Sequence, residues 1–226
     1  MEDPRYTALR QDMVKLITIH AALVAGHTGK SAIDQRVMEV MGEVARHEFV
    51  PHEYRAMAYN DHPLPIGYDK TVSQPFMVAF MTDLLEIEPH HRVLEIGTGL
   101  GYQAAVLCRL AEMVYSIEII DELHDEAKRR LAEQGCVNIE LRLGNGYGGW
   151  PEEAPFDVII ATAAPDLIPP PLLQQLKPGG KMVIPAGIED AQQLMTVVKD
   201  TEGRIKTREI LPVRFSSMIA GDDATF

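Results

Sequence analysis

The sequence predicts an α/β fold built on a mostly parallel, seven-stranded sheet with helices on both faces. From residue 76 onward, apolar strand-like segments alternate with segments of helical periodicity, as they do when right-handed crossovers join parallel strands. A glycine-rich turn at 97–101 separates the first buried strand from the helix after it. The last two strands flank the turn 200–203, which is typical of an antiparallel hairpin.

The length of 226 residues suits a single domain, 1–226, in which an N-terminal extension packs on a core. We expect residues 1–75 to form helices and a loop, and residues 76–215 to form the core. Within the extension, helices are predicted at 6–24 and 33–44 and an irregular loop at 59–68.

The core elements follow from periodicity and from turn residues. Pro75 suits the first turn of a helix, and composition alone makes Ser73 or Gln74 its ordinary N-cap. Helices are predicted at 76–85, 102–107, 121–134 and 172–176, and strands at 93–96, 114–118, 139–143, 156–162, 181–185, 193–198 and 204–211.

Composition excludes several classes of protein. The net charge of −12 disfavours a general nucleic-acid surface. Glu2 and Asp3 precede any apolar residue, so no secretory signal is expected, and the apolar stretch 16–25 is too short to span a membrane. Two cysteines without a spacing pattern indicate a reduced, cytoplasmic protein, and the histidines show no metal-ligand spacing. We expect a monomer that binds no metal, nucleic acid or membrane.

The glycine-rich turn is a candidate ligand site. Its spacing is Gly-x-Gly-x-Gly, and Glu95 lies two residues before Gly97. A dinucleotide site has Gly-x-Gly-x-x-Gly and holds a pyrophosphate at the helix N-terminus, where an anionic Glu95 would repel it. S-adenosylmethionine carries no phosphate, and its ammonium suits an acid at this place. The motif therefore favours a methyl donor over NAD.

A second acid supports this interpretation. Glu118 ends the next predicted strand, 21 residues after Gly97, close to where an adenosine ribose needs a carboxylate acceptor. The strand count and terminal hairpin agree with the Rossmann-like fold of class I S-adenosylmethionine-dependent methyltransferases. Two other interpretations stay open: a plain strand-turn-helix with incidental acids, and an NAD-dependent oxidoreductase.

Several stretches together closely resemble the protein-L-isoaspartate O-methyltransferase family. The resemblance covers roughly residues 10 to 214, and the most diagnostic stretch is 71–75, Thr-Val-Ser-Gln-Pro, which generic methyltransferases lack. The other matching stretches are 46–51, 59–67, 95–101, 149–157 and 176–185.

The resemblance implies methyl transfer from S-adenosylmethionine to the free α-carboxylate of L-isoaspartyl residues in damaged proteins or peptides, which is a repair reaction. It implies Ser73 as the catalytic residue. The implied cofactor-binding residues are Thr71, Val72, Gln74, Glu95, Gly97, Thr98, Gly99, Gly101, Glu118, Asn145 and Gly146, and the implied substrate-binding residues are Pro65, Ile66, Thr162, Ala163 and Ala164.

The chain departs from the family pattern at two places. Asn145 stands where the family usually has aspartate, and its carbonyl can still accept a hydrogen bond from an adenine amino group. Ser216-Ser217-Met218-Ile219 replaces a Val-Pro-Leu tail that in the family closes over peptide and cofactor. The altered tail leaves two alternatives: a related methyltransferase that modifies an aspartate in one dedicated peptide, and a non-catalytic binding module.

Overall fold

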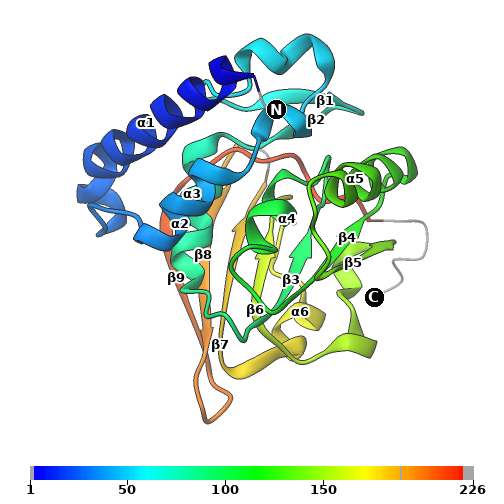
Figure 1. The fold of residues 1–226 in the computed structure, drawn as a ribbon. Helices are drawn as coiled ribbons and strands as arrows, with labels where there is room; N and C mark the ends of the chain where they lie inside the picture. Colours follow the sequence, from blue (N-terminus) through cyan, green and yellow to red (C-terminus); the bar gives the residue numbers. More distant parts are fainter. Residues whose placement is uncertain (1–2, 189, 221–226) are drawn as a thin grey trace.

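In the computed structural model, which describes residues 3–188 and 190–220, a seven-stranded sheet forms the centre of the molecule (Figure 1). Its strand order is β5-β4-β3-β6-β7-β8-β9, and in this sheet β8 runs opposite in direction to the other six strands. The predicted α/β fold with a terminal hairpin is confirmed. The strands are β3 (Arg92–Ile96), β4 (Met113–Glu118), β5 (Ile139–Leu143), β6 (Phe156–Ala161), β7 (Leu176–Ala186), β8 (Gln193–Lys199) and β9 (Ile205–Pro212).

Helices cover both faces of this sheet because successive strand residues bury their side chains on opposite sides. On one face, Val93 and Val158 pack into the same apolar cluster as α3 (Pro75–Leu85), α4 (Tyr102–Leu107) and α5 (Asp121–Glu133). On the other face, Leu94 and Ile159 pack with α6 (Pro170–Gln175) and the residues around the 3-10 turns η3 (Gly146–Gly148) and η4 (Pro151–Glu153).

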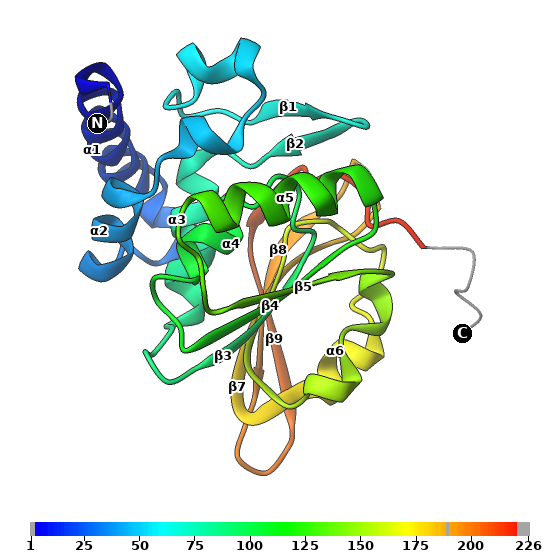
Figure 2. The same cartoon turned by 45° about the vertical axis from the view of Figure 1, so that its right-hand side comes forward.

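The N-terminal extension stacks outside α3 (Figure 2). It contains α1 (Pro4–Thr28), α2 (Gln35–Glu43) and the 3-10 turns η1 (Arg46–Phe49) and η2 (His52–Met57). The first helix is longer than predicted because Asp3 caps it, accepting from the Arg5 amide, and because Gly29, with φ of 75°, ends it. No helix in the described part of the chain combines the length and apolarity needed to cross a bilayer.

The predicted irregular loop at 59–68 contains the start of an antiparallel hairpin, which is a correction to the sequence prediction. Its strands are β1 (Leu64–Gly67) and β2 (Lys70–Val72). The turn uses Tyr68 and Asp69 at positive φ, a conformation that non-glycine residues rarely adopt. The residue types at these two positions therefore do not predict a tight turn. The hairpin carries the segment 71–74 to the end of the sheet where β3 and β6 finish (Figure 2).

The strand β7 also begins earlier than predicted. Phe156 pairs with Leu176, and the next register pair is Val158 with Lys181, so the extra residues 177–180 bulge out of the ladder. The lysine, proline and glycines of that segment indicate a turn by composition, whereas the structure includes them in the strand.

Candidate active site

The glycine-rich turn forms the floor of a cavity at the carboxyl ends of β3, β4 and β6. Gly97, Gly99 and Gly101 all have positive φ. A Cβ on Gly97 would lie 2.7 Å from the Thr162 hydroxyl oxygen, which donates a 2.6 Å hydrogen bond to the Gly97 carbonyl. Only glycine fits between these two strand ends.

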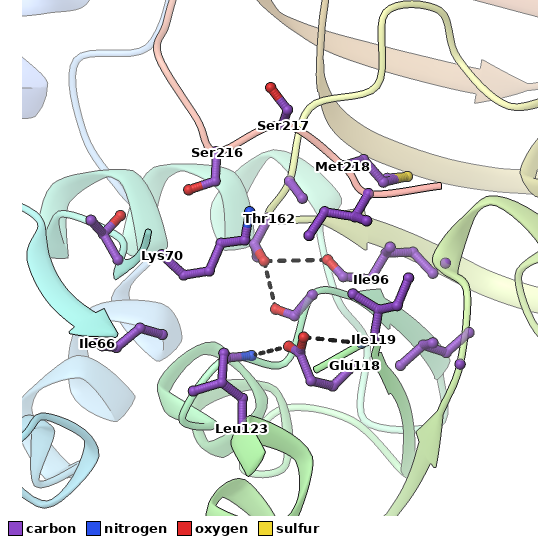
Figure 3. A pocket seen from close by; sticks show the side chains of 18 residues that line it. Ile66, Lys70, Ile96, Glu118, Ile119, Leu123, Thr162, Ser216, Ser217 and Met218 are labelled. Carbon is purple, nitrogen blue, oxygen red and sulfur yellow. Dashed lines mark hydrogen bonds between the residues drawn. The ribbon is translucent and has the colours of Figure 1, made fainter. Parts of the chain in front are cut away.

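Glu118 is the carboxylate that faces this cavity (Figure 3). Its side chain accepts from the Gly99 amide at 2.7 Å and from the amides of Ile119 and Ile120 at 3.0 and 3.1 Å. These bonds fix the carboxylate at the end of β4: Oε1 accepts from both isoleucine amides, and Oε2, which accepts from Gly99 alone, keeps a lone pair for a further donor. The arrangement suits a ligand with vicinal hydroxyls.

Glu95 does not reach the cavity. Its side chain points under the glycine turn, fully buried, where the Ser116 hydroxyl donates a 2.5 Å hydrogen bond to it. Its other oxygen has no partner within the described residues, and burial raises the pKa of Glu95 to about 8. A carboxyl that is neutral at pH 7 neither holds an ammonium nor repels a pyrophosphate, so the electrostatic role expected for Glu95 is not supported.

Thr98 and Gly101 also lie behind the cavity wall. The Thr98 hydroxyl is 2.7 Å from the Ser116 oxygen, which continues the chain that starts at Glu95. Gly101 is the N-cap of α4, and a Cβ there would lie 3.0 Å from the Leu131 side chain. Both residues hold the turn in place from below.

Asn145 and Gly146 follow β5 on the same rim. The Asn145 side chain accepts from the Tyr147 amide at 2.9 Å and caps η3, so it shapes the backbone next to the cavity. Gly146 lines the cavity, and a Cβ there would approach Ile96 Cγ2 to 2.3 Å. The asparagine therefore places a glycine whose lack of a side chain keeps the cavity open.

A second, larger groove of about 650 Å³ adjoins the cavity, and Ser73 lines it with Gln74. The N-cap position of α3 belongs to Gln74, but the side chain that accepts from the first available helical amide, that of Phe76, is Asp61, at 2.8 Å. Gln74 donates to the same Asp61. The ordinary capping role considered for Ser73 is thus wrong, and its hydroxyl has no partner within the described residues.

The cavity and the groove share part of their lining. Thr71 and Thr162 contribute to both, and Ile66 and Ala163 line the cavity alone. Val72, the last residue of β2, is buried and lines neither space. Ala164 is buried and contributes its backbone to a contact with the tail, while Pro65 lines neither space. The structure therefore brings most predicted substrate residues to the rim and leaves Pro65 outside.

The tail residues 216–219 form the roof of the cavity, at the place where the family resemblance led us to expect a closing segment. The Ala164 amide donates to the Ser216 carbonyl at 2.9 Å, and the Met218 amide donates to the Ala164 carbonyl at 2.8 Å. The Met218 side chain is buried in the cluster below the sheet. With this roof closed the cavity measures about 70 Å³, well below the roughly 300–1,000 Å³ of small-molecule sites. A ligand of nucleoside size requires the tail to move.

The fold, the glycine turn and the ribose-type carboxylate define a class I S-adenosylmethionine-dependent methyltransferase. The family model described as Protein-L-isoaspartate(D-aspartate) O-methyltransferase (PCMT) matches residues 20–222. The chain belongs to this family. This membership leaves no support for the NAD-dependent alternative.

Individual proteins similar to this chain carry the name of the same family. Protein-L-isoaspartate O-methyltransferase 1 of Polaromonas sp. strain JS666 is 59% identical over 216 residues, which cover 96% of this chain and 92% of the relative. Protein-L-isoaspartate O-methyltransferase 2 of Syntrophobacter fumaroxidans is 54% identical, over 97% and 89%. A solved protein-L-isoaspartate O-methyltransferase structure matches 94% of this chain and 66% of its own, with 27% identity and a TM-score of 0.79.

A second solved structure shares the fold. It is a Plasmodium falciparum protein described as a putative protein-L-isoaspartate O-methyltransferase in complex with S-adenosyl-L-homocysteine. The match covers 95% of this chain and 98% of the other, with 21% identity and a TM-score of 0.76.

Proposed function

We propose that this protein transfers the methyl group of S-adenosylmethionine to the free α-carboxylate of L-isoaspartyl residues in damaged proteins or peptides. The observation that carries the proposal is the junction of the two spaces, where Ser73 and Thr71 of the family-specific segment meet the cavity floored by the glycine turn. One space suits a nucleoside, and the other is open enough for a peptide.

The residues that would hold the cofactor fit it in shape and in donor set. Gly97 and Gly146 keep space that a Cβ would fill, and Glu118 presents a fixed carboxylate to ribose hydroxyls. Glu95 and Thr98 act on the site through Ser116, as positioning residues below the turn. When bound, the cofactor supplies an electrophilic methyl group on a sulfonium.

The acceptor needs no general base, because a carboxylate with a reference pKa of about 4 is ionised at neutral pH. The protein's contribution is alignment of the carboxylate with the methyl–sulfur bond and exclusion of water by the tail. The Ser73 hydroxyl, which has no other partner among the residues that the structure describes, would donate a hydrogen bond that orients the carboxylate. A backbone amide nitrogen of the substrate then attacks the ester carbonyl and displaces methanol, which closes a succinimide that water opens partly to normal aspartate.

The test is methylation of matched peptides with labelled S-adenosylmethionine. Repair predicts that an isoaspartyl peptide is methylated and that the same peptide with a normal aspartyl residue is not. The alternative, a methyltransferase for an aspartate in one dedicated peptide, is favoured by the atypical tail 216–219, which lines the cavity and, through Ser216 and Ser217, also the groove. Label on aspartyl peptides alone would replace the repair assignment with that alternative.

Ser73→Ala should lower kcat/KM by about 10- to 100-fold, since a hydrogen bond to a charged group contributes roughly 1.5–3 kcal/mol. The affinity for S-adenosylhomocysteine should stay unchanged because Ser73 lines the groove and not the cofactor cavity. Steady-state kinetics and titration calorimetry check the two parts. Unchanged turnover removes Ser73 from the mechanism.

We also propose a monomer that acts in the cytoplasm. Cys108 and Cys136 are both free thiols, which is typical of reducing compartments. Light scattering on the purified protein tests the first part, and a mass near twice 25.1 kDa would contradict it.

A further inference from the structure

Lys70 stands at the junction of the cofactor cavity and the substrate groove. The residues that line both spaces are Lys70, Thr71, Thr162, Ser216 and Ser217, and Lys70 is the charged one among them. It is the first residue of β2, and Figure 3 shows its side chain extending into the space between β2 and the tail. The family-specific segment containing Ser73 follows it directly.

The Lys70 ammonium has no counter-ion within the described residues, although the side chain is half-buried. Asp69 lines the same groove but forms no ion pair with Lys70 in the described structure, and His20 of that groove is 2.9 Å from a different acid, Asp61. An ammonium removed partly from water is costly unless an anion compensates it. A binding partner with a negative charge at the junction would supply that compensation.

The groove contains a second cation besides Lys70. Arg214, on the segment that leads into the tail, also lines it and makes no ion pair within the described residues. Among the described residues that line the groove, Lys70 and Arg214 are cations without an ion pair and Asp69 is the single acid, in a chain whose net charge is −12. The local charge is opposite to that of the whole molecule and suits an anionic substrate.

We propose that Lys70 binds the α-carboxylate that accepts the methyl group and so selects an ionised carboxylate at the reaction centre; this inference rests on the proposed function. The carboxylate is an anion before transfer and a neutral ester afterwards. The attraction to Lys70 therefore stabilises the bound substrate and disappears in the product. The attraction to Lys70 should therefore lower KM and allow the neutral ester to leave, whereas the Ser73 hydroxyl acts on the transfer step.

The experiment compares the wild type with Lys70→Gln, Lys70→Arg and the control Lys128→Gln, an exposed lysine on α5 that lines neither space. With an isoaspartyl peptide, Lys70→Gln should raise KM about three- to tenfold and leave kcat within about twofold, as expected for loss of one partly screened ion pair. Lys70→Arg should retain most of the wild-type KM. Thermal unfolding establishes that each variant is folded.

A second measurement separates charge recognition from general damage to the site. In the presence of S-adenosylhomocysteine, the Kd of the isoaspartyl peptide should rise in Lys70→Gln, and the Kd of the same peptide with its α-carboxylate replaced by a carboxamide should not. Equal losses for both peptides, or a KM equal to that of Lys128→Gln, would overturn the role of Lys70. A wild type that is inactive on isoaspartyl peptides would instead overturn the proposed function.

Discussion

At the residue level, the buried carboxyl of Glu95 is the most unusual group next to the site. It lies on β3 opposite Ser116 of β4, and its only described hydrogen bond is to that hydroxyl. Burial is the main cause that raises its pKa to about 8, and the nearby charge of Glu118 adds to it. The carboxyl is therefore a neutral hydrogen-bonding group that supports the turn through Ser116 and Thr98.

This pKa shift makes stability depend on pH. The folded pKa, about 8, is above the ordinary glutamate value of 4.5, so between these values the folded state holds a proton that the unfolded state has released. Stability therefore falls as pH rises through that window and levels off above it. Glu95→Gln should remove the dependence, so that the variant gains about 1.4 kcal/mol relative to the wild type for each pH unit in the window.

Urea unfolding of both proteins at several pH values between 5 and 9 measures this difference. Taking the difference between the two proteins removes the pH dependence that comes from groups titrating equally in both. Parallel pH profiles for wild type and Glu95→Gln would show that Glu95 is ionised in the folded protein.

At the level of elements, the tail is the part of the site that has to move. Residues 216–219 are held by the two backbone hydrogen bonds to Ala164 and by burial of Met218, which is 8% exposed. The rest of the cavity wall is made of strand ends and short turns anchored in the core. Ligand entry and release are therefore expected to follow opening of the tail.

Met218→Ala should weaken this roof, because truncating a buried methionine removes much of the apolar contact that anchors the segment. We expect S-adenosylhomocysteine to dissociate about ten times faster and the thermal midpoint of the ligand-free protein to change little. Stopped-flow displacement measures the rate, with Val137→Ala, which truncates a side chain that is 92% exposed, as the matched control. A dissociation rate equal to that of the control would show that the tail does not gate the cavity.

The elements that the sequence predicted well are those whose pattern of apolar and polar residues lies within one short segment. The strands β3, β4 and β5 fall within a residue of prediction. The buried strands β3 and β4 appear as apolar runs between turns, and the edge strand β5 appears as an alternation of apolar and polar residues. Glu118 was found as a site residue because it ends such a strand. The β1–β2 hairpin was missed because its turn uses Tyr68 and Asp69 at positive φ, which no local pattern requires.

The site residues that the sequence missed depend on contacts between distant segments. Ser217 pairs with Ala164 across a long stretch of chain, and Lys70 reaches the junction only because the hairpin folds toward the end of the sheet. The misplaced role of Glu95 has a related cause. The alternation of side chains along β3 puts Glu95 on the same face as Val93, which α3, α4 and α5 cover, and a strand's sequence does not say which face its polar residue meets.

At the level of the whole molecule, ligand binding and folding are coupled, because the cavity is made of strand ends that exist only in the folded sheet. A ligand that binds the folded state alone stabilises it by about 2.7 kcal/mol at 100 times its Kd. For a chain of 226 residues this corresponds to a rise in Tm of roughly 5–10 °C. S-adenosylhomocysteine should produce this shift, and NAD should produce none, since the glycine turn has the wrong spacing for a pyrophosphate. Differential scanning fluorimetry with both ligands decides the matter: a shift with NAD but not with S-adenosylhomocysteine would mean that the cavity takes a dinucleotide.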